Sequence, residues 1–143
     1  MADKSVLIVE DAVVIAEHLK MLVENQGYRV AGVTDNGREA LELVDSDPPD
    51  LILMDIKLIG DIDGIEAVRR LKEKHGEQIG VVYVTAYGDE VTLKKARESG
   101  AKALFTKPVR KEALDWILRW YFEDEQELSS TPSSLQAWFF NSE

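Results

Sequence analysis

The chain of 143 residues contains no cysteine. Disulfide bonds, zinc–thiolate centres and thiol nucleophiles are therefore excluded. Basic residues are in the minority, because 17 lysines and arginines stand against 27 aspartates and glutamates, for a net charge of −10. Proteins that bind nucleic-acid phosphates or anionic membranes do so through basic patches. We therefore expect neither a nucleic-acid partner nor a membrane partner, and interpret the charge mainly as an acidic, soluble surface.

Long apolar runs are absent as well. No stretch approaches the roughly 18 apolar residues of a membrane span. The apolar run near the N-terminus, residues 6–9, is cut off by acidic residues, which is untypical of a signal peptide. These absences predict a cytoplasmic protein. The chain does have 45% hydrophobic residues, enough for a core, in a length that suits one domain.

Short apolar segments alternate with helical patterns along the chain. Strands are predicted at 5–9, 28–34, 51–54, 81–85 and 103–106. Helices are predicted at 13–25, 36–45, 65–74, 89–99 and 109–121, with Asn36 as an N-cap and Gly27 as a C-terminal stop. Three of the strands are apolar throughout, which is typical of parallel strands buried on both faces. The strict alternation predicts an α/β fold with a parallel sheet and helices on both faces.

The character of the chain changes after residue 122. Residues 123–134, "EDEQELSSTPSS", are acidic and then rich in serine, threonine and proline, as in a linker. Residues 135–143, "LQAWFFNSE", contain three adjacent aromatic residues. We therefore expect a domain over 1–122 and a linker with an aromatic tail over 123–143. Exposed apolar clusters usually mark contacts, so we expect the tail to dock, either on its own domain or on a neighbouring subunit.

Polar residues follow or end four of the predicted strands: Glu10, Asp11, Asp55, Thr85 and Lys107. The carboxyl ends of parallel strands meet at one edge of the sheet, which is where ligands bind in such folds. Clustered carboxylates repel one another, and a hard cation such as Mg²⁺ removes that repulsion. A lysine and a hydroxyl can hold phosphoryl oxygens, and an aspartate beside them can attack phosphorus. The set therefore predicts a magnesium-dependent phosphoacceptor at Asp55.

Each of these residues also has a plainer explanation. Glu10 and Asp11 could cap the next helix, whose N-terminus favours negative charge. Thr85 could be an ordinary β-branched strand end, and Lys107 a surface lysine before a proline. The joint pattern favours the site, because four strand ends in the right order each carry the right residue type.

The sequence resembles the receiver domain of two-component response regulators. The resemblance is carried by "VLIVED" (6–11), "LILMDI" (51–56), "DGIEAVRRL" (63–71), "VVYVTAY" (81–87) and "SGAKALFTKP" (99–108), and it spans roughly residues 4–121. It implies a flavodoxin-like, doubly wound, five-stranded parallel sheet of strand order 2-1-3-4-5 with five helices. It also implies a signalling phosphoacceptor that catalyses its own phosphotransfer and dephosphorylation, rather than an enzyme acting on other substrates.

By position, the resemblance implies that Asp55 accepts a phosphoryl group from a sensor histidine kinase or a phosphotransfer protein. Glu10 and Asp11 would hold Mg²⁺ together with Asp55 and the backbone carbonyl of Lys57. Thr85 would contact the phosphoryl oxygens.

Lys107 would contact the same oxygens, and its bond to Pro108 falls where the family often has a cis peptide. Phosphorylation would switch the surface formed by helices 89–99 and 109–121 and strand 103–106. The family often uses that surface for homodimers or partners, and the C-terminal tail is a second candidate contact.

Some positions depart from the family. Ile59 stands where a proline is common, in a loop that is slightly longer. The usual switch aromatic falls on Leu104, and the neighbouring Phe105 should face the opposite way, so the usual coupling of Thr85 to an aromatic ring is in doubt.

Two further positions, Lys57 and Tyr87, occupy the family's water path to the acyl phosphate. A cation and a bulky phenol there predict slow self-dephosphorylation.

Two other classes remain as alternatives. A metal-dependent phosphohydrolase with Asp55 as nucleophile would want a second acid two residues on, where Lys57 stands. A nucleotide- or flavin-binding protein would want a glycine-rich loop after the first strand, where the chain reads "EDAVVIAEH".

The roughly twenty residues after the receiver pattern are too few for a folded output domain, so we expect a stand-alone receiver or a piece of a longer protein. In the loop after Asp55, Asp63 is predicted to cap a helix and Asp61 to be solvated.

Overall fold

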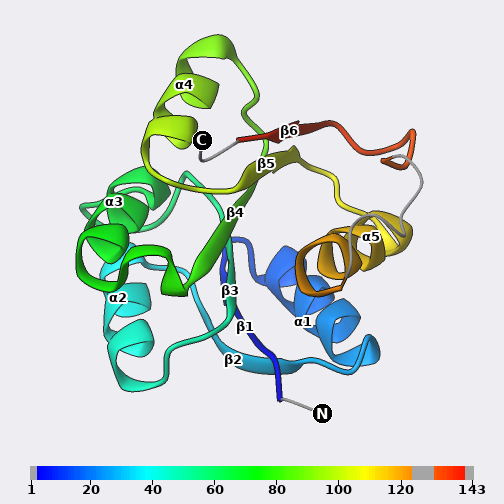
Figure 1. The fold of residues 1–143 in the computed structure, drawn as a ribbon, viewed down its shortest axis with the longest axis horizontal. Coiled ribbons are helices and arrows are strands. Elements are labelled where there is room, and N and C mark those ends of the chain that lie inside the picture. The colour runs from blue at the N-terminus through cyan, green and yellow to red at the C-terminus, as the bar shows by residue number, and fades with distance from the viewer. Residues whose placement is uncertain (1–2, 124–130, 141–143) are drawn as a thin grey trace.

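A sheet runs through the middle of the molecule, with helices on both faces (Figure 1). The computed structural model describes residues 3–123 and 131–140. The strands are β1 (Ser5–Val9), β2 (Arg29–Thr34), β3 (Leu51–Met54), β4 (Gly80–Thr85), β5 (Ala103–Thr106) and β6 (Ala137–Phe139). The helices are α1 (Val13–Asn25), α2 (Gly37–Ser46), α3 (Gly64–His75), α4 (Glu90–Glu98) and α5 (Lys111–Phe122), with a short 3₁₀ turn, η1 (Gly76–Gln78), after α3.

The strand order is β2-β1-β3-β4-β5-β6. The first five strands in this order pair in parallel, which confirms the predicted fold class and the order 2-1-3-4-5. The expectation of a five-stranded sheet is corrected by β6, which pairs antiparallel with β5 at the sheet's edge. Of the expected linker, residues 124–130 lie outside the described residues. Within the expected tail, residues 137–139 form β6 and pack on their own domain.

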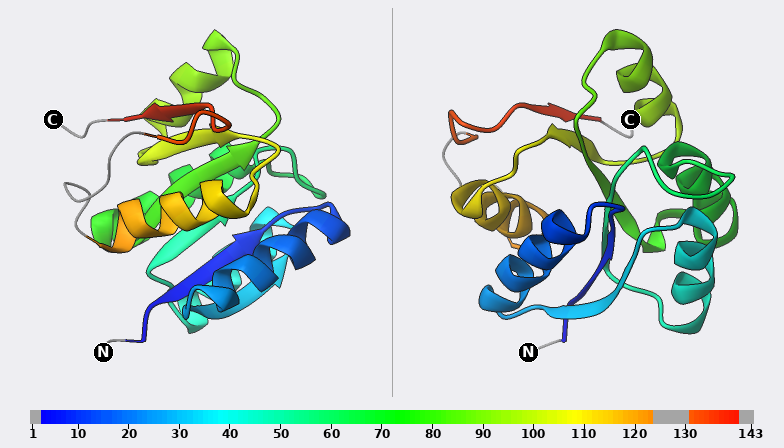
Figure 2. Two further views of the ribbon diagram at one scale, coloured as in Figure 1. Left: turned by 90° about the vertical axis from the view of Figure 1, so that its right-hand side faces the viewer. Right: turned by 180° about the vertical axis from the view of Figure 1, so that it is seen from behind.

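The two faces of the sheet carry separate cores. Helices α1 and α5 cover one face, and α2, α3 and α4 cover the other (Figure 2). Side chains along β1 alternate between them, with Val6 and Ile8 in the first core and Leu7 and Val9 in the second. Every residue of β1, β3 and β4 is buried, as expected for apolar strands enclosed by helices on both sides.

Local sequence signals define several helix ends. The side chain of Asn36 accepts a hydrogen bond from the Glu39 backbone N–H, so the predicted N-cap of α2 is confirmed. Asp63 caps α3 in the same way, as predicted. Gly27 follows α1 with a φ of 91°, a conformation that glycine adopts without a Cβ penalty. In residues 3–123 and 131–140, none of the helices has the length and apolar character needed to cross a bilayer.

Candidate functional site

The backbone ladders continue past the strand ends and thereby place the polar side chains at one edge of the sheet. The Asp55 N–H donates to the Val9 carbonyl at 2.9 Å, beside the end of β1. The Lys107 N–H likewise donates to the Thr85 carbonyl at 2.8 Å, which ties the residue after β5 to the end of β4. Positions far apart in the sequence are thus held side by side by main-chain bonds.

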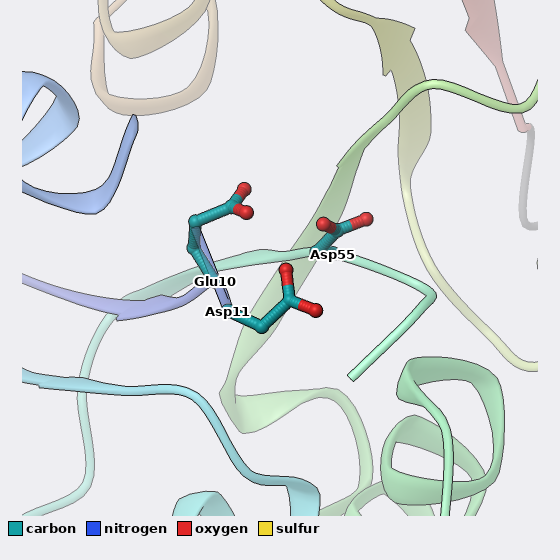
Figure 3. Close-up of side chains that lie close together, drawn as sticks. All are labelled: Glu10, Asp11 and Asp55. Carbon is teal, nitrogen blue, oxygen red and sulfur yellow. The ribbon is translucent and has the colours of Figure 1, made fainter. Parts of the chain in front are cut away.

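Three carboxylates meet at this edge (Figure 3). Glu10, Asp11 and Asp55 each offer an oxygen, and these oxygens lie within 4.8 Å of one another. Glu10 and Asp55 are only 3% and 5% exposed, whereas Asp11 is more open to solvent. Hard oxygen donors at this spacing, with one side open for water, suit Mg²⁺, so the residues present fit the expected ion.

Lys107 bridges the two buried acids. Its Nζ lies 2.8 Å from Glu10 Oε1 and 2.8 Å from Asp55 Oδ2, and its side chain is 18% exposed. Each acid also accepts a backbone hydrogen bond with its other oxygen: Glu10 Oε2 from Ala12 at 3.0 Å and Asp55 Oδ1 from Ile56 at 2.7 Å. The buried charges are therefore paired and hydrogen-bonded, as buried charges must be to be tolerated.

The pKa values of this pair reflect opposing effects. Burial raises the pKa of Glu10, and the negative charge of Asp55 raises it further. Hydrogen bonds from Lys107 and from the Ala12 N–H lower it. Burial is the largest effect, so the pKa of Glu10 lies above its ordinary value. Burial by itself would lower the pKa of Lys107, but its hydrogen bonds and charge interactions with Asp55 and Glu10 prevail and hold the pKa above the ordinary value. Lys107 is therefore held as a cation between the two acids.

The peptide bond between Lys107 and Pro108 is cis, as the resemblance to receiver domains implied.

Thr85 is the last residue of β4, the strand that pairs with β3. Its side chain is fully buried, and Oγ1 has no hydrogen-bond partner among the described residues. A buried hydroxyl without a partner costs roughly 1–3 kcal/mol, so the site favours a ligand that brings an acceptor. Because β4 pairs with β3, the hydroxyl lies on the strand adjoining Asp55.

Lys57 and Tyr87 lie in the loops that follow β3 and β4 at the same edge. The Lys57 Nζ is placed over the Tyr87 ring, 5.2 Å from its centroid, in a cation–π contact. Both side chains are exposed, so the contact forms a rim rather than part of the buried site.

Leu104 and Phe105 are both fully buried. They belong to opposite cores, which confirms that Phe105 does not take the place of Leu104.

Asp61 is exposed, as predicted, but it also forms an ion pair with Arg38, with 2.8 Å between Arg38 Nε and Asp61 Oδ1.

Gly64 and Trp138 have structural roles that the sequence patterns did not specify. Gly64 packs against the backbone of Asp55, where an added Cβ would collide with the Asp55 carbonyl oxygen, and its N–H donates to the Ile56 carbonyl at 2.7 Å. The only sequence signal was a glycine directly after the N-cap Asp63. Trp138 of β6 comes from the tail and packs in the same core as Leu104.

Comparison with known proteins agrees with this geometry. The family model of the response regulator receiver domain matches residues 6–119. Sporulation initiation phosphotransferase F of Bacillus subtilis is 37% identical over 108 residues, which cover 76% of this chain and 85% of that protein. Chemotaxis protein CheY of Thermotoga maritima is 35% identical over 105 residues, covering 73% of this chain and 86% of that protein. A CheY-like receiver domain from Methanospirillum hungatei has a TM-score of 0.77 at 28% identity, covering 89% of this chain and 100% of that one.

Other relatives are longer than this chain. Transcriptional regulatory protein YdfI of Bacillus subtilis is 38% identical to this chain over 110 residues. The match covers 76% of this chain but only 50% of that protein. It covers 30% of a protein-glutamate methylesterase of Hahella chejuensis. The matched residues of this chain include its receiver domain, and receiver domains are generally signalling domains rather than enzymes. The match of the family model over most of the chain, and the relatives above 30% identity, show that the chain belongs to the response regulator receiver domain family of two-component signalling.

Proposed function

We propose that Asp55 accepts a phosphoryl group from a histidine kinase or a phosphotransfer protein and that the chain signals through this modification. The observation that supports this most strongly is the convergence of Asp55, Glu10 and Asp11 on one point, with Lys107 bonded at 2.8 Å to two of them. A nucleophile, a cation-binding acid pair and a fixed ammonium are the groups that phosphoryl transfer requires.

In the proposed reaction a carboxylate oxygen of Asp55 attacks the phosphorus of a phosphohistidine. The new O–P bond forms as the P–N bond breaks, and the imidazole leaves with the electron pair of that bond. Lys107 balances negative charge that moves onto the phosphoryl oxygens, and Thr85 donates its hydroxyl hydrogen to one of them.

Glu10, Asp11, Asp55 and the backbone carbonyl of Lys57 are the ligands we assign to Mg²⁺. The ion, when bound, neutralises charge between Asp55 and the incoming phosphoryl group. Asp11 is suited to this role because it is the most exposed of the three acids and makes no bond to Lys107 among the described contacts.

An apolar surface beside the site is suited to the donor protein. Val13 and Val14, in the first turn of α1, are 74% and 81% exposed. A neighbouring cavity is lined by Val14, Ile15, His18, Leu19, Val84, Lys107, Pro108 and Val109. Exposed apolar side chains next to a reactive group favour contact with another protein, and we assign this face to the phosphodonor.

Self-dephosphorylation is expected to be slow. The Lys57–Tyr87 contact stands over the loops that border Asp55 and would obstruct an attacking water. Receiver output is expected at the surface of α4, β5 and α5, with homodimerisation there as one form of it, in a cytoplasmic protein.

The test is labelling with a small phosphodonor such as acetyl phosphate, with Mg²⁺ and with EDTA. We expect stoichiometric, Mg²⁺-dependent labelling of the protein and none in Asp55→Asn. Asp61→Asn, in the loop that follows, is the matched control and should label like the wild type. Labelling that persists in Asp55→Asn would overturn the proposal. Continuous turnover of a phosphoester by the wild type would favour the phosphohydrolase instead, for which Lys57 occupies the position of the second acid.

A further inference from the structure

The C-terminal strand supplies an aromatic ring beside Leu104, on the face of the sheet where β5 itself carries no aromatic side chain. Trp138 on β6 pairs directly with Leu104 on β5, so both side chains point to the same face of the sheet. Trp138 packs against the core on that face, whereas Phe139 points to the other side and lies against Phe105 and Trp120. The position next to Leu104 is therefore filled by a ring from another element.

The Trp138 ring touches the loop between Thr85 and α4. It lies so close to Gly88 that a Cβ added there would be 2.9 Å from Cη2 of the ring. Gly88 follows Thr85 by three residues, and the strand end and the ring are therefore joined by a short segment of backbone. A displacement of Thr85 would therefore also shift the backbone at this contact.

Strand β6 also ties the helices on both sides of β5 together. Phe140 lies 5.8 Å beneath the guanidinium of Arg97 on α4. Phe139 lies 5.1 Å from Trp120 and 6.0 Å from Trp116, both on α5. The tail thus occupies the free edge of β5, between α4 and α5, where the two helices flank it (Figure 1).

The hydroxyl of Thr85 provides the driving force for a movement. It is buried without a hydrogen-bond partner among the described residues, and a phosphoryl oxygen on Asp55 would supply one. Drawing Thr85 toward Asp55 pulls the following loop toward the site and therefore away from Trp138. The ring then loses its contact with Gly88, and β6 is held only by its short ladder to β5 and by the ring contacts of Phe139 and Phe140.

We propose that Trp138 is a positioning residue that couples Asp55 to the C-terminal strand, so that phosphorylation loosens β6 and uncovers the edge of β5. This rests on the proposed phosphorylation of Asp55. Because coupling between two sites is reciprocal, docked β6 also opposes phosphorylation. In this proposal β6 covers the edge of β5, which is part of the surface that a signalling partner would use.

The experiment measures hydrogen exchange of a peptide covering residues 135–140 in the full chain, with and without beryllofluoride and Mg²⁺. Binding of beryllofluoride is followed separately by fluorine NMR. We expect exchange of the β6 amides to accelerate about five-fold or more when beryllofluoride binds, the lower end of typical coupling between sites. By reciprocity, Trp138→Ala should bind beryllofluoride about five-fold or more tightly than the wild type.

Three variants together separate coupling from simple loss of packing. Phe139→Ala removes a ring from the other face of β6, so it should speed exchange without abolishing the response to beryllofluoride. Gly88→Ala places a methyl group against the Trp138 ring and should speed exchange before beryllofluoride is added. Trp138→Ala should exchange fast in both states and lose the response.

The outcomes are distinct. If fluorine NMR shows no binding, the proposed function fails and this inference with it. If beryllofluoride binds but exchange of β6 is unchanged or slower, the coupling is refuted while the phosphoacceptor stands. A response that survives in Trp138→Ala also refutes it.

Discussion

Replacing Lys107 by methionine tests the reasoning about the site most directly. The variant removes the ammonium that lies 2.8 Å from both Glu10 and Asp55 but keeps a side chain of similar length. Two carboxylates that are 3% and 5% exposed are then left buried, close together and unpaired. Removing one partner of a buried ion pair costs about 3–5 kcal/mol, and because Lys107 is partly exposed we expect about 3 kcal/mol. At roughly 3 °C per kcal/mol, this lowers Tm by about 10 °C.

The loss should depend on pH in a defined direction. Burial raises the pKa of Glu10 and the bond to Lys107 lowers it, so the variant's folded-state pKa lies still higher. An acid whose pKa is raised by folding binds its proton more tightly in the folded state. The free energy of unfolding of Lys107→Met should therefore fall as pH rises above the ordinary value of 4.5, and the difference from the wild type should shrink below that pH.

The assay is urea unfolding in EDTA over this pH range, repeated with Mg²⁺ and with Asp55→Asn. Magnesium at about 100 times its Kd would restore about 2.7 kcal/mol, because a bound cation replaces the lost charge. Asp55→Asn should destabilise the wild type, since Lys107 loses an acceptor, but stabilise Lys107→Met, since it removes the repulsion with Glu10. A variant as stable as the wild type in EDTA at neutral pH, or the same sign for Asp55→Asn in both backgrounds, would refute the reasoning.

Three further predictions follow from single contacts. Gly64→Ala should destabilise the fold by several kcal/mol in urea unfolding and weaken phosphodonor labelling, because the new methyl group collides with the Asp55 carbonyl. Unchanged labelling and stability would contradict the close contact between Gly64 and the Asp55 backbone. Asp63→Ala should cost about 1 kcal/mol of unfolding free energy through loss of the α3 N-cap and leave labelling intact. Lys57→Ala and Tyr87→Ala should each speed the decay of the phosphorylated protein, because each removes the cation–π contact at the rim of the site. The decay is measured after removal of the phosphodonor, and decay at the wild-type rate would show that the pair does not obstruct water.

Much of the architecture followed from local patterns. The apolar runs 51–54 and 103–106 coincide with β3 and β5, and the helix 13–25 with α1. The N-caps Asn36 and Asp63 were likewise readable, since a cap is satisfied within a few residues of itself. The start of α5, which has no side-chain cap, was less readable: the helix begins at Lys111 rather than at residue 109.

The sequence by itself determined which residues end the parallel strands, and hence that Glu10, Asp11, Asp55, Thr85 and Lys107 share one edge. Strand direction and alternation with helices are enough for that conclusion. The tertiary structure alone decided how they meet: that Lys107 bonds to both buried acids, and that the Thr85 hydroxyl finds no hydrogen-bond partner within residues 3–123 and 131–140. Those contacts join residues 52 or more positions apart, and their distances depend on strand register rather than on any local pattern.

The tail shows the same division. Its aromatic residues indicated docking, but a strand of three residues carries no periodicity that distinguishes it from a loop. Only the antiparallel pairing with β5 places Trp138 beside Leu104 and against Gly88, and Phe139 on the opposite face. Strand β6 pairs with β5 because β5 lies at an edge of the parallel sheet and its outer side is open to another strand. That edge is a property of the assembled fold and not of the last nine residues of the sequence.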